Sequence, residues 1–231
     1  MKLILLPGLD GTGLLFQPLL EALPSELDVI VISYPHDVLM SYEELIEYVA
    51  ARLPEEDYIL IAESFAGPIA YQLVQRKPSH LKSVIFVATF LDSPRPLLGR
   101  LSGLFSPSLI RFMPDLMLKT FLLGSAANKG MLKLFKESVN KVSPKVLSFR
   151  LGELSKRSKL DHHQDQKQNV SAIYIQASND KLVLKKSVKD FKKVFSGLEV
   201  FEVKGSHFIL QTNPQACSQI INNHLLSIAN T

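Results

Sequence analysis

Ser64 stands where an apolar run, Ile59–Ala62, meets a stretch of helical pattern that begins near Pro68. The residues two positions before and after it, Ala62 and Ala66, are small. A sharp strand-to-helix turn packs closely against adjacent backbone and needs small residues there, and it lifts a hydroxyl off the sheet edge, toward the amides of the following helix. The pattern A-x-S-x-A therefore predicts a nucleophilic serine. The alternative is an ordinary serine that caps the helix.

A serine needs a base, and the base needs an orienting carboxylate, before it becomes a useful nucleophile. Asp180 and His207 each come shortly after an apolar run that predicts a buried strand. Together with Ser64 they follow the chain order Ser, Asp, His. The carboxyl ends of parallel strands face one crevice, so we expect Ser64, Asp180 and His207 to meet there. Asp92, after an earlier strand run, is the rival acid; Asp180 is favoured because it immediately precedes the strand that leads to His207. Alternatively, Asp180 is a turn residue and His207 a loop histidine.

A glycine-rich loop, Pro7–Gly13, follows the first apolar run of the chain. In an acyl-transfer site such a loop supplies one backbone N–H to the developing oxyanion, and the residue after the nucleophile supplies the other. We therefore expect the oxyanion donors to be the amides of Leu9 and Phe65. The competing interpretation is dinucleotide binding, which the sequence disfavours because the glycines are not spaced G-x-G-x-x-G.

The elements that would position these groups alternate along the chain. Short, nearly continuous apolar runs are typical of strands buried on both faces of a parallel sheet, and they are Lys2–Leu6, Val29–Tyr34, Tyr58–Ala62, Ser83–Thr89, Ala172–Ala177 and Leu198–Val203. Amphipathic stretches lie between or after them, at Ser41–Leu53, Pro68–Gln75, Val188–Phe195 and Pro214–Ile228. In the first of these, Ser41 and Glu44 form a capping-box pattern. The alternation predicts an α/β fold whose mostly parallel sheet of about six strands is flanked by helices.

Residues 91–169 break this alternation, because they contain prolines and apolar clusters of helical type but no strand pattern. We expect a helical cap inserted into a core made of residues 1–90 and 170–231. Leu116, Phe121 and Phe112 are candidates for binding an acyl chain under this cap, although packing of the helices against the sheet explains such residues equally well. The polar run Asp161–Asp165, with its two histidines, is interpreted as a solvated loop rather than a metal site.

These features together resemble the α/β-hydrolase superfamily over essentially the whole chain. The matching residues are the Pro7–Gly13 loop, the turn at Ser64, the acid Asp180 and the base His207, with a cap inserted between two strands. The resemblance implies an N-terminally shortened hydrolase fold and a serine hydrolase that cleaves a carboxylic ester with a lipophilic acyl group. It leaves open a thioesterase, an acyl-carrier ester hydrolase or acyltransferase, and a non-catalytic binding protein.

Composition and charge exclude several other classes of protein. The 231 residues contain a single cysteine, Cys217, which excludes an internal disulfide, and no apolar run approaches the length of a membrane span. The first 100 residues are net acidic and the rest net basic, within a net charge of +4. The basic part of the chain could bind an acidic acyl carrier. Its lysines, however, are dispersed and have no aromatic residues between them. This pattern is more typical of solvated helix faces, and it argues against nucleic-acid binding. We expect a cytoplasmic enzyme that needs no cofactor or metal and acts on a small acyl ester.

Overall fold

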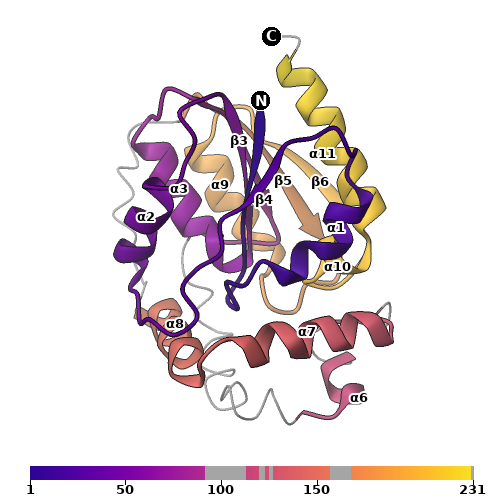
Figure 1. Ribbon diagram of the computed structural model, residues 1–231. Coiled ribbons are helices and arrows are strands. Elements are labelled where there is room, and N and C mark those ends of the chain that lie inside the picture. The colour runs from indigo at the N-terminus through magenta and orange to yellow at the C-terminus, as the bar shows by residue number, and fades with distance from the viewer. Residues whose placement is uncertain (92–112, 120–122, 125–126, 157–167, 230–231) are drawn as a thin grey trace.

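The computed structural model describes residues 1–91, 113–119, 123–124, 127–156 and 168–229. Its centre is a six-stranded sheet in which every pairing is parallel (Figure 1). In spatial order the strands are β2 (Val29–Val31), β1 (Lys2–Leu6), β3 (Tyr58–Glu63), β4 (Leu81–Val87), β5 (Ser171–Ala177) and β6 (Glu199–Val203). The α/β architecture and the six strands expected from the sequence are confirmed.

Helices cover both faces of the sheet, and each face has its own apolar cluster. One cluster joins the sheet to α2 (Tyr42–Ala50), α3 (Gly67–Gln75) and α9 (Val188–Val194), which the short helix η4 (Lys185–Ser187) precedes. The other joins it to η1 (Leu14–Phe16), α1 (Gln17–Ala22), α10 (Ile209–Thr212) and α11 (Pro214–Ala229). The central strands are buried along nearly their whole length because both faces are covered, which explains their continuous apolar sequences.

Local sequence determines several element boundaries. The capping box predicted at the start of α2 is present: the Glu44 amide donates to Ser41 Oγ, and the Ser41 amide donates to Glu44 Oε2 at 2.7 Å. The second strand is shorter than its apolar run Val29–Tyr34: β2 lies at the edge of the sheet, and its register with β1 ends at Val31. The chain nevertheless stays beside β1 and the loop that follows it, since the Tyr34 amide donates to the Gly11 carbonyl at 2.8 Å.

Between β4 and β5 the described residues form α6 (Asp115–Leu118), α7 (Lys129–Lys141) and α8 (Pro144–Lys156). Figure 1 shows these helices below the carboxyl ends of the strands. They share a third apolar cluster with Leu15 of η1, and an ion pair of 2.5 Å between Lys136 and Asp115 links α7 to α6. The helical content agrees with the sequence pattern, while the division into a core and a cap stays a prediction.

The single cysteine lies in the core. Cys217 of α11 is fully buried in the second apolar cluster, and this burial raises the pKa of its thiol to about 12.

Among the described residues, no helix combines the length and the apolar character that crossing a lipid bilayer requires.

Candidate active site

The candidate site lies at the carboxyl ends of β1 and β3, where the direction of strand addition reverses. From β1 the chain first adds β2 on one side and then crosses over to add β3 on the other. The loops that leave the two neighbouring strands therefore diverge and open a crevice between them. The Pro7–Gly13 loop follows β1, and Ser64 follows β3, so both predicted elements flank this crevice.

Ser64 occupies a strained turn between β3 and the short helix η2 (Ser64–Ala66), which runs directly into α3. Its φ is 51°, in the left-handed region that non-glycine residues rarely adopt. The surrounding structure stabilises this conformation, because the Ser64 carbonyl accepts a hydrogen bond from Thr89 Oγ1. Thr89 is itself fixed, since its amide donates to the Tyr174 hydroxyl at 3.0 Å and its carbonyl accepts from that hydroxyl at 2.6 Å. Such a strained, braced serine is typical of a functional residue.

Gly67 provides the close approach that this turn needs. A Cβ at Gly67 would overlap Thr89 Oγ1 and come within 2.8 Å of the Phe90 carbonyl oxygen. Ala62 and Ala66 are completely buried, which agrees with the small size expected at those positions. The sequence reasoning considered only positions two residues from Ser64 and missed Gly67, although the glycine directly before Pro68 was a visible signal.

The three side chains predicted to meet form one hydrogen-bonded chain. His207 Nε2 lies 2.7 Å from Ser64 Oγ, and His207 Nδ1 lies 2.8 Å from Asp180 Oδ2. The side chains of His207 and Asp180 are 6% and 3% exposed, so water screens the pair little. This geometry fits proton transfer from the serine hydroxyl to the imidazole, with the carboxylate holding the ring.

Backbone hydrogen bonds between two loops hold Asp180 and His207 in place. The amide of Ser178 donates to the Val203 carbonyl, and the amide of Asn179 donates to the Gly205 carbonyl, both at 2.9 Å. The loop after β5 therefore runs alongside the loop after β6. This pairing places a residue of each loop at the same edge of the sheet.

The Asp180 carboxylate divides its two oxygens between different partners. Oδ1 accepts hydrogen bonds from the amides of Leu182 and Val183, each at 2.8 Å, and Oδ2 faces His207. Burial by itself lowers the pKa of His207, but the charge and hydrogen bond of Asp180, with the charge of Glu63, raise it above its usual value. The imidazole is therefore a stronger base than an isolated histidine.

The Pro7–Gly13 loop lies directly against the nucleophile. A Cβ on Gly8 would be 3.6 Å from Ser64 Cβ, and the Gly8 carbonyl accepts a hydrogen bond of 3.1 Å from the Gly11 amide. In a trans peptide unit the C=O and the following N–H point in opposite directions, so the Leu9 N–H points away from this turn. The Phe65 amide lies in the first turn of η2, where amides have no intrahelical partner. The backbone geometry therefore leaves the N–H groups of both Leu9 and Phe65 available to a bound ligand.

Glu63 is a buried acid that sequence reasoning did not single out. It directly precedes Ser64, is 5% exposed, and accepts a hydrogen bond of 2.8 Å from Gln211 Nε2. Burial raises the pKa of Glu63 to about 7, against the opposing influence of Gln211 and of the charge on His207. A charged residue type at the end of an otherwise apolar strand was the available signal.

The remaining predicted residues are not brought to this centre by the described structure. Leu116 lies on α6 and is 75% exposed. Phe112 and Phe121 lie outside the described residues, as do the rival acid Asp92 and the polar run Asp161–Asp165. The acyl-binding role of Leu116, Phe121 and Phe112 therefore stays a prediction.

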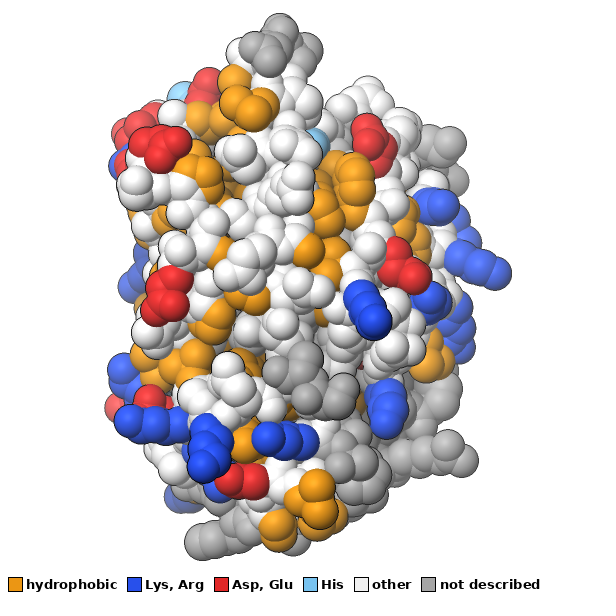
Figure 2. All heavy atoms as spheres, turned by 90° about the vertical axis from the view of Figure 1, so that its right-hand side faces the viewer, with side chains coloured by type: hydrophobic (Ala, Val, Ile, Leu, Met, Phe, Trp, Pro, Cys, Tyr) orange, Lys and Arg blue, Asp and Glu red, His pale blue; other side chains and the backbone are white. Residues whose placement is uncertain are grey.

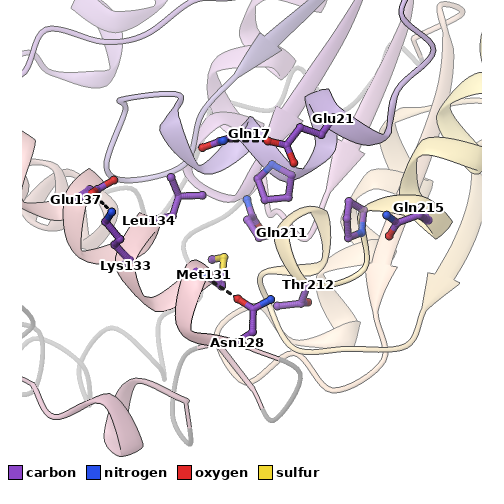
Figure 3. A pocket seen from close by; sticks show the side chains of 13 residues that line it. Gln17, Glu21, Asn128, Met131, Lys133, Leu134, Glu137, Gln211, Thr212 and Gln215 are labelled. Carbon is purple, nitrogen blue, oxygen red and sulfur yellow. Dashed lines mark hydrogen bonds and ion pairs between the residues drawn. The ribbon is translucent and has the colours of Figure 1, made fainter.

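A cavity of about 530 Å³ lies beside this centre, between α7 on one side and α1, α10 and the start of α11 on the other (Figure 3). The ion pair Lys133–Glu137 and the hydrogen bond between Gln17 and Glu21 border it from opposite sides. It is connected to the centre through Gln211, which lines the cavity and binds Glu63. The triad side chains are not among the described residues that line it.

The parallel sheet, the strained serine turn and the Ser64–His207–Asp180 hydrogen bonds define the class: the chain is a member of the α/β-hydrolase superfamily. The model of the family described as "Serine aminopeptidase, S33" matches residues 30–200, more than half of the chain. The chain therefore belongs to this family. A comparison with curated proteins finds no significant match.

Solved structures share the fold over nearly the whole chain. A lipase-esterase related protein from Clostridium acetobutylicum is 16% identical, with 96% of this chain and 93% of that chain covered and a TM-score of 0.76. The type II thioesterase BorB from the borrelidin biosynthetic cluster is 20% identical, with 97% and 92% covered and a TM-score of 0.71. A membrane phospholipase A, a bacterial virulence factor, is 16% identical, with 100% and 80% covered and a TM-score of 0.80. At these identities the similarity establishes the fold alone.

Proposed function

We propose that the protein is a serine hydrolase that cleaves carboxylic esters through an acyl-enzyme, with Ser64 as nucleophile, His207 as general base and Asp180 as the orienting acid. The observation that carries this proposal is the continuous hydrogen-bonded chain from Ser64 Oγ through the His207 ring to Asp180, with distances of 2.7 and 2.8 Å. Nucleophile and base are already within hydrogen-bonding reach, as this chemistry requires.

In the first half of the reaction, Ser64 Oγ bonds to the acyl carbon while His207 Nε2 takes the hydroxyl proton. The carbonyl oxygen becomes an oxyanion and accepts hydrogen bonds from the amides of Leu9 and Phe65. When the tetrahedral intermediate collapses, the ester C–O bond breaks and His207 gives its proton to the departing alcohol. The acyl group remains on Ser64.

In the second half, His207 takes a proton from a water molecule as its oxygen attacks the acyl carbon. Collapse of this second intermediate breaks the bond to Ser64 Oγ, and His207 returns the proton to the serine. The oxygens of Asp180 accept hydrogen bonds from two amides and from the imidazole. Asp180 holds the ring in one tautomer and stabilises the imidazolium that forms twice per turnover.

The apolar surroundings of His207 support an ester with a lipophilic acyl group. Phe208 packs edge-on against the His207 ring at 5.3 Å, and Phe135 of α7 packs edge-on against Phe208 at 5.7 Å. These aromatic rings connect the base to the apolar cluster of α6, α7 and α8, which also contains Leu118 and Leu123. An acyl chain that lies against these apolar side chains would bury apolar surface, at about 25 cal/mol per Å².

An acidic acyl carrier is a further candidate partner, and the argument for it is the positive charge of the C-terminal part of the chain alone. Figure 2 shows lysine and arginine side chains along the lower half and one flank of the α11 face, interspersed with acidic side chains. Several lysines of the described residues are paired, for example Lys136 with Asp115 and Lys185 with Glu202. This pairing lowers the net charge that a carrier would meet, so a small ester is the favoured substrate.

A fluorophosphonate probe tests the enzyme proposal directly, because it phosphonylates an activated serine. We expect the folded wild-type protein to be labelled and the S64A variant to remain unlabelled. The matched control is S25A, which changes an exposed serine outside the proposed triad and outside the loops that hold it. A folded wild-type protein that resists the probe, or an S64A variant labelled as strongly, would refute the proposal.

p-Nitrophenyl esters of increasing chain length test the substrate class. We expect kcat/KM to rise from the acetate to the octanoate as more of the acyl chain is buried. A clear preference for the acetate would contradict the lipophilic acyl site. Faster turnover of the matching thioester, or capture of the acyl group by an added alcohol, would identify a thioesterase or an acyltransferase instead.

A further inference from the structure

Arg150 connects the inserted helix α8 to the loop that carries the proposed oxyanion donor. Its side chain is only 2% exposed. Nη1 donates to the Leu9 carbonyl at 3.0 Å and to the Asp10 carbonyl at 2.8 Å, while Nη2 donates to the Pro35 carbonyl at 2.8 Å. One guanidinium therefore binds three backbone carbonyls of two separate loops.

These contacts complete the hydrogen bonding of the loop. The Gly8 carbonyl is bound by the Gly11 amide and the Gly11 carbonyl by the Tyr34 amide, whereas the two carbonyls between them, of Leu9 and Asp10, are bound by Arg150. Four successive peptide units are thus held in orientation. Without the guanidinium, the two middle units would lose a charged donor in a buried place, which is unfavourable.

The loop has almost no free space around this guanidinium. A Cβ on Gly11, whose φ is 69°, would approach Arg150 Nη1 to 2.5 Å and Tyr34 Cδ2 to 2.8 Å. The guanidinium also lies over the Tyr34 ring, at 5.4 Å from its centre. The position of Arg150 therefore determines where the backbone of the loop can lie.

We propose that Arg150 is a positioning residue that holds the Pro7–Gly13 loop so that the Leu9 N–H points at the oxyanion. The proposal rests on the proposed function, because it assigns a purpose to the loop of that same site. Arg150 does not touch the reacting atoms. It acts through the Leu9 and Asp10 carbonyls, which belong to the peptide units directly after the Leu9 N–H. It also makes the oxyanion site depend on α8, an element inserted between β4 and β5.

The test compares R150M, R150K and a matched control, L147A. Leu147 lies one helical turn before Arg150 on α8 and is 4% exposed in the third apolar cluster, so L147A loosens the packing of the same helix without touching the loop. Steady-state kinetics with p-nitrophenyl butyrate are measured beside thermal unfolding. Hydrogen–deuterium exchange of the segment that covers residues 7–16 reports the loop independently of activity.

We expect R150M to lower kcat by about 10- to 100-fold, with KM changed less than about threefold. Removal of a whole oxyanion donor costs about 100- to 1000-fold, and R150M only displaces one. R150K should recover about tenfold of this loss, because a lysine ammonium can reach the neighbouring Leu9 and Asp10 carbonyls but not that of Pro35 as well. Exchange in residues 7–16 should become faster in R150M and stay at the wild-type rate in L147A.

Equal loss of kcat in R150M and L147A at equal loss of stability would overturn the proposal, since Arg150 would then act only through folding. Unchanged exchange in residues 7–16 of R150M would overturn it as well. If R150M does not fold, R150K becomes the deciding variant. The proposal is then overturned if R150K has the kcat of the wild type and if its residues 7–16 exchange at the wild-type rate. If the wild-type protein reacts with neither the ester nor the fluorophosphonate, the hydrolase proposal fails, and the exchange data alone decide whether Arg150 holds the loop.

Discussion

The buried acid next to the nucleophile yields a quantitative prediction for the variant E63Q. Burial raises the pKa of Glu63 from 4.5 to about 7. Below pH 4.5 the group is protonated in both the native and the unfolded protein. Between 4.5 and 7 the unfolded chain releases this proton while the native protein keeps it, so the free energy of unfolding falls as the pH rises. At about 1.4 kcal/mol per pH unit, the total loss reaches about 3 kcal/mol above pH 7.

Glutamine removes this titration and keeps the shape of the side chain. Its oxygen can still accept from Gln211 Nε2, and its amide can donate to Gln211 Oε1, a buried atom with no protein partner among the described residues. Urea unfolding of both proteins at pH 5, 6, 7 and 8 measures the effect. We expect the stability of wild type relative to E63Q to fall by about 2–3 kcal/mol across this range. The exposed substitution E26Q should show no such trend.

Catalysis provides a second measurement on the same variant. The negative charge of Glu63 contributes to the raised pKa of His207. A neutral residue at position 63 removes this contribution, so the acid limb of the kcat/KM profile should move to lower pH in E63Q. A stability difference that is independent of pH, together with an unmoved acid limb, would refute the reasoning that Glu63 ionises in the native protein near neutral pH.

Three further substitutions have defined outcomes. D180N should lower kcat on a p-nitrophenyl ester by about 10³- to 10⁴-fold with little change in KM, because the amide no longer holds the required tautomer of His207; wild-type turnover would exclude Asp180 as the acid. G67A should destabilise the protein by about 1–3 kcal/mol in thermal unfolding, because its Cβ would overlap Thr89. G152A should instead stabilise it by about 0.5–1 kcal/mol, since a Cβ at this position in α8 meets nothing within 4 Å. A destabilised G152A or an unaffected G67A would contradict the packing around these two glycines.

The four central strands of the sheet could be predicted from the sequence because they are buried on both faces. Such strands must be continuously apolar, and Lys2–Leu6 appears in the structure with the same limits as its apolar run. The edge strand β2 was predicted too long, because the buried residues Ile32 and Tyr34 lie beyond Val31, where its register with β1 ends. An apolar run predicts which residues are buried, but the length of a strand depends on how far it pairs with its neighbour.

The meeting of the three triad side chains also follows from a rule that the sequence contains. Ser64 directly follows β3, whereas Asp180 lies in the loop after β5 and His207 in the loop after β6. Parallel strands bring their carboxyl ends to one edge. Their catalytic roles stay predictions. Gly67 and Glu63 each had a local signal, a glycine directly before Pro68 and a charged residue at the end of an apolar strand. Arg150 had none, because its partners are distant in the sequence: Arg150 and Leu9 are 141 positions apart.

The enclosed position of Cys217 has a practical use. Its thiol is the only one in the 231-residue chain, and it is both completely buried and weakly acidic. Thiolate is the species that reacts with maleimides, so the native cysteine should remain silent toward them in the folded protein. Cysteines introduced singly at solvent-facing sites, such as Lys133 on α7 and Glu26 near β2, could then carry spin or fluorescent labels without any prior cysteine removal.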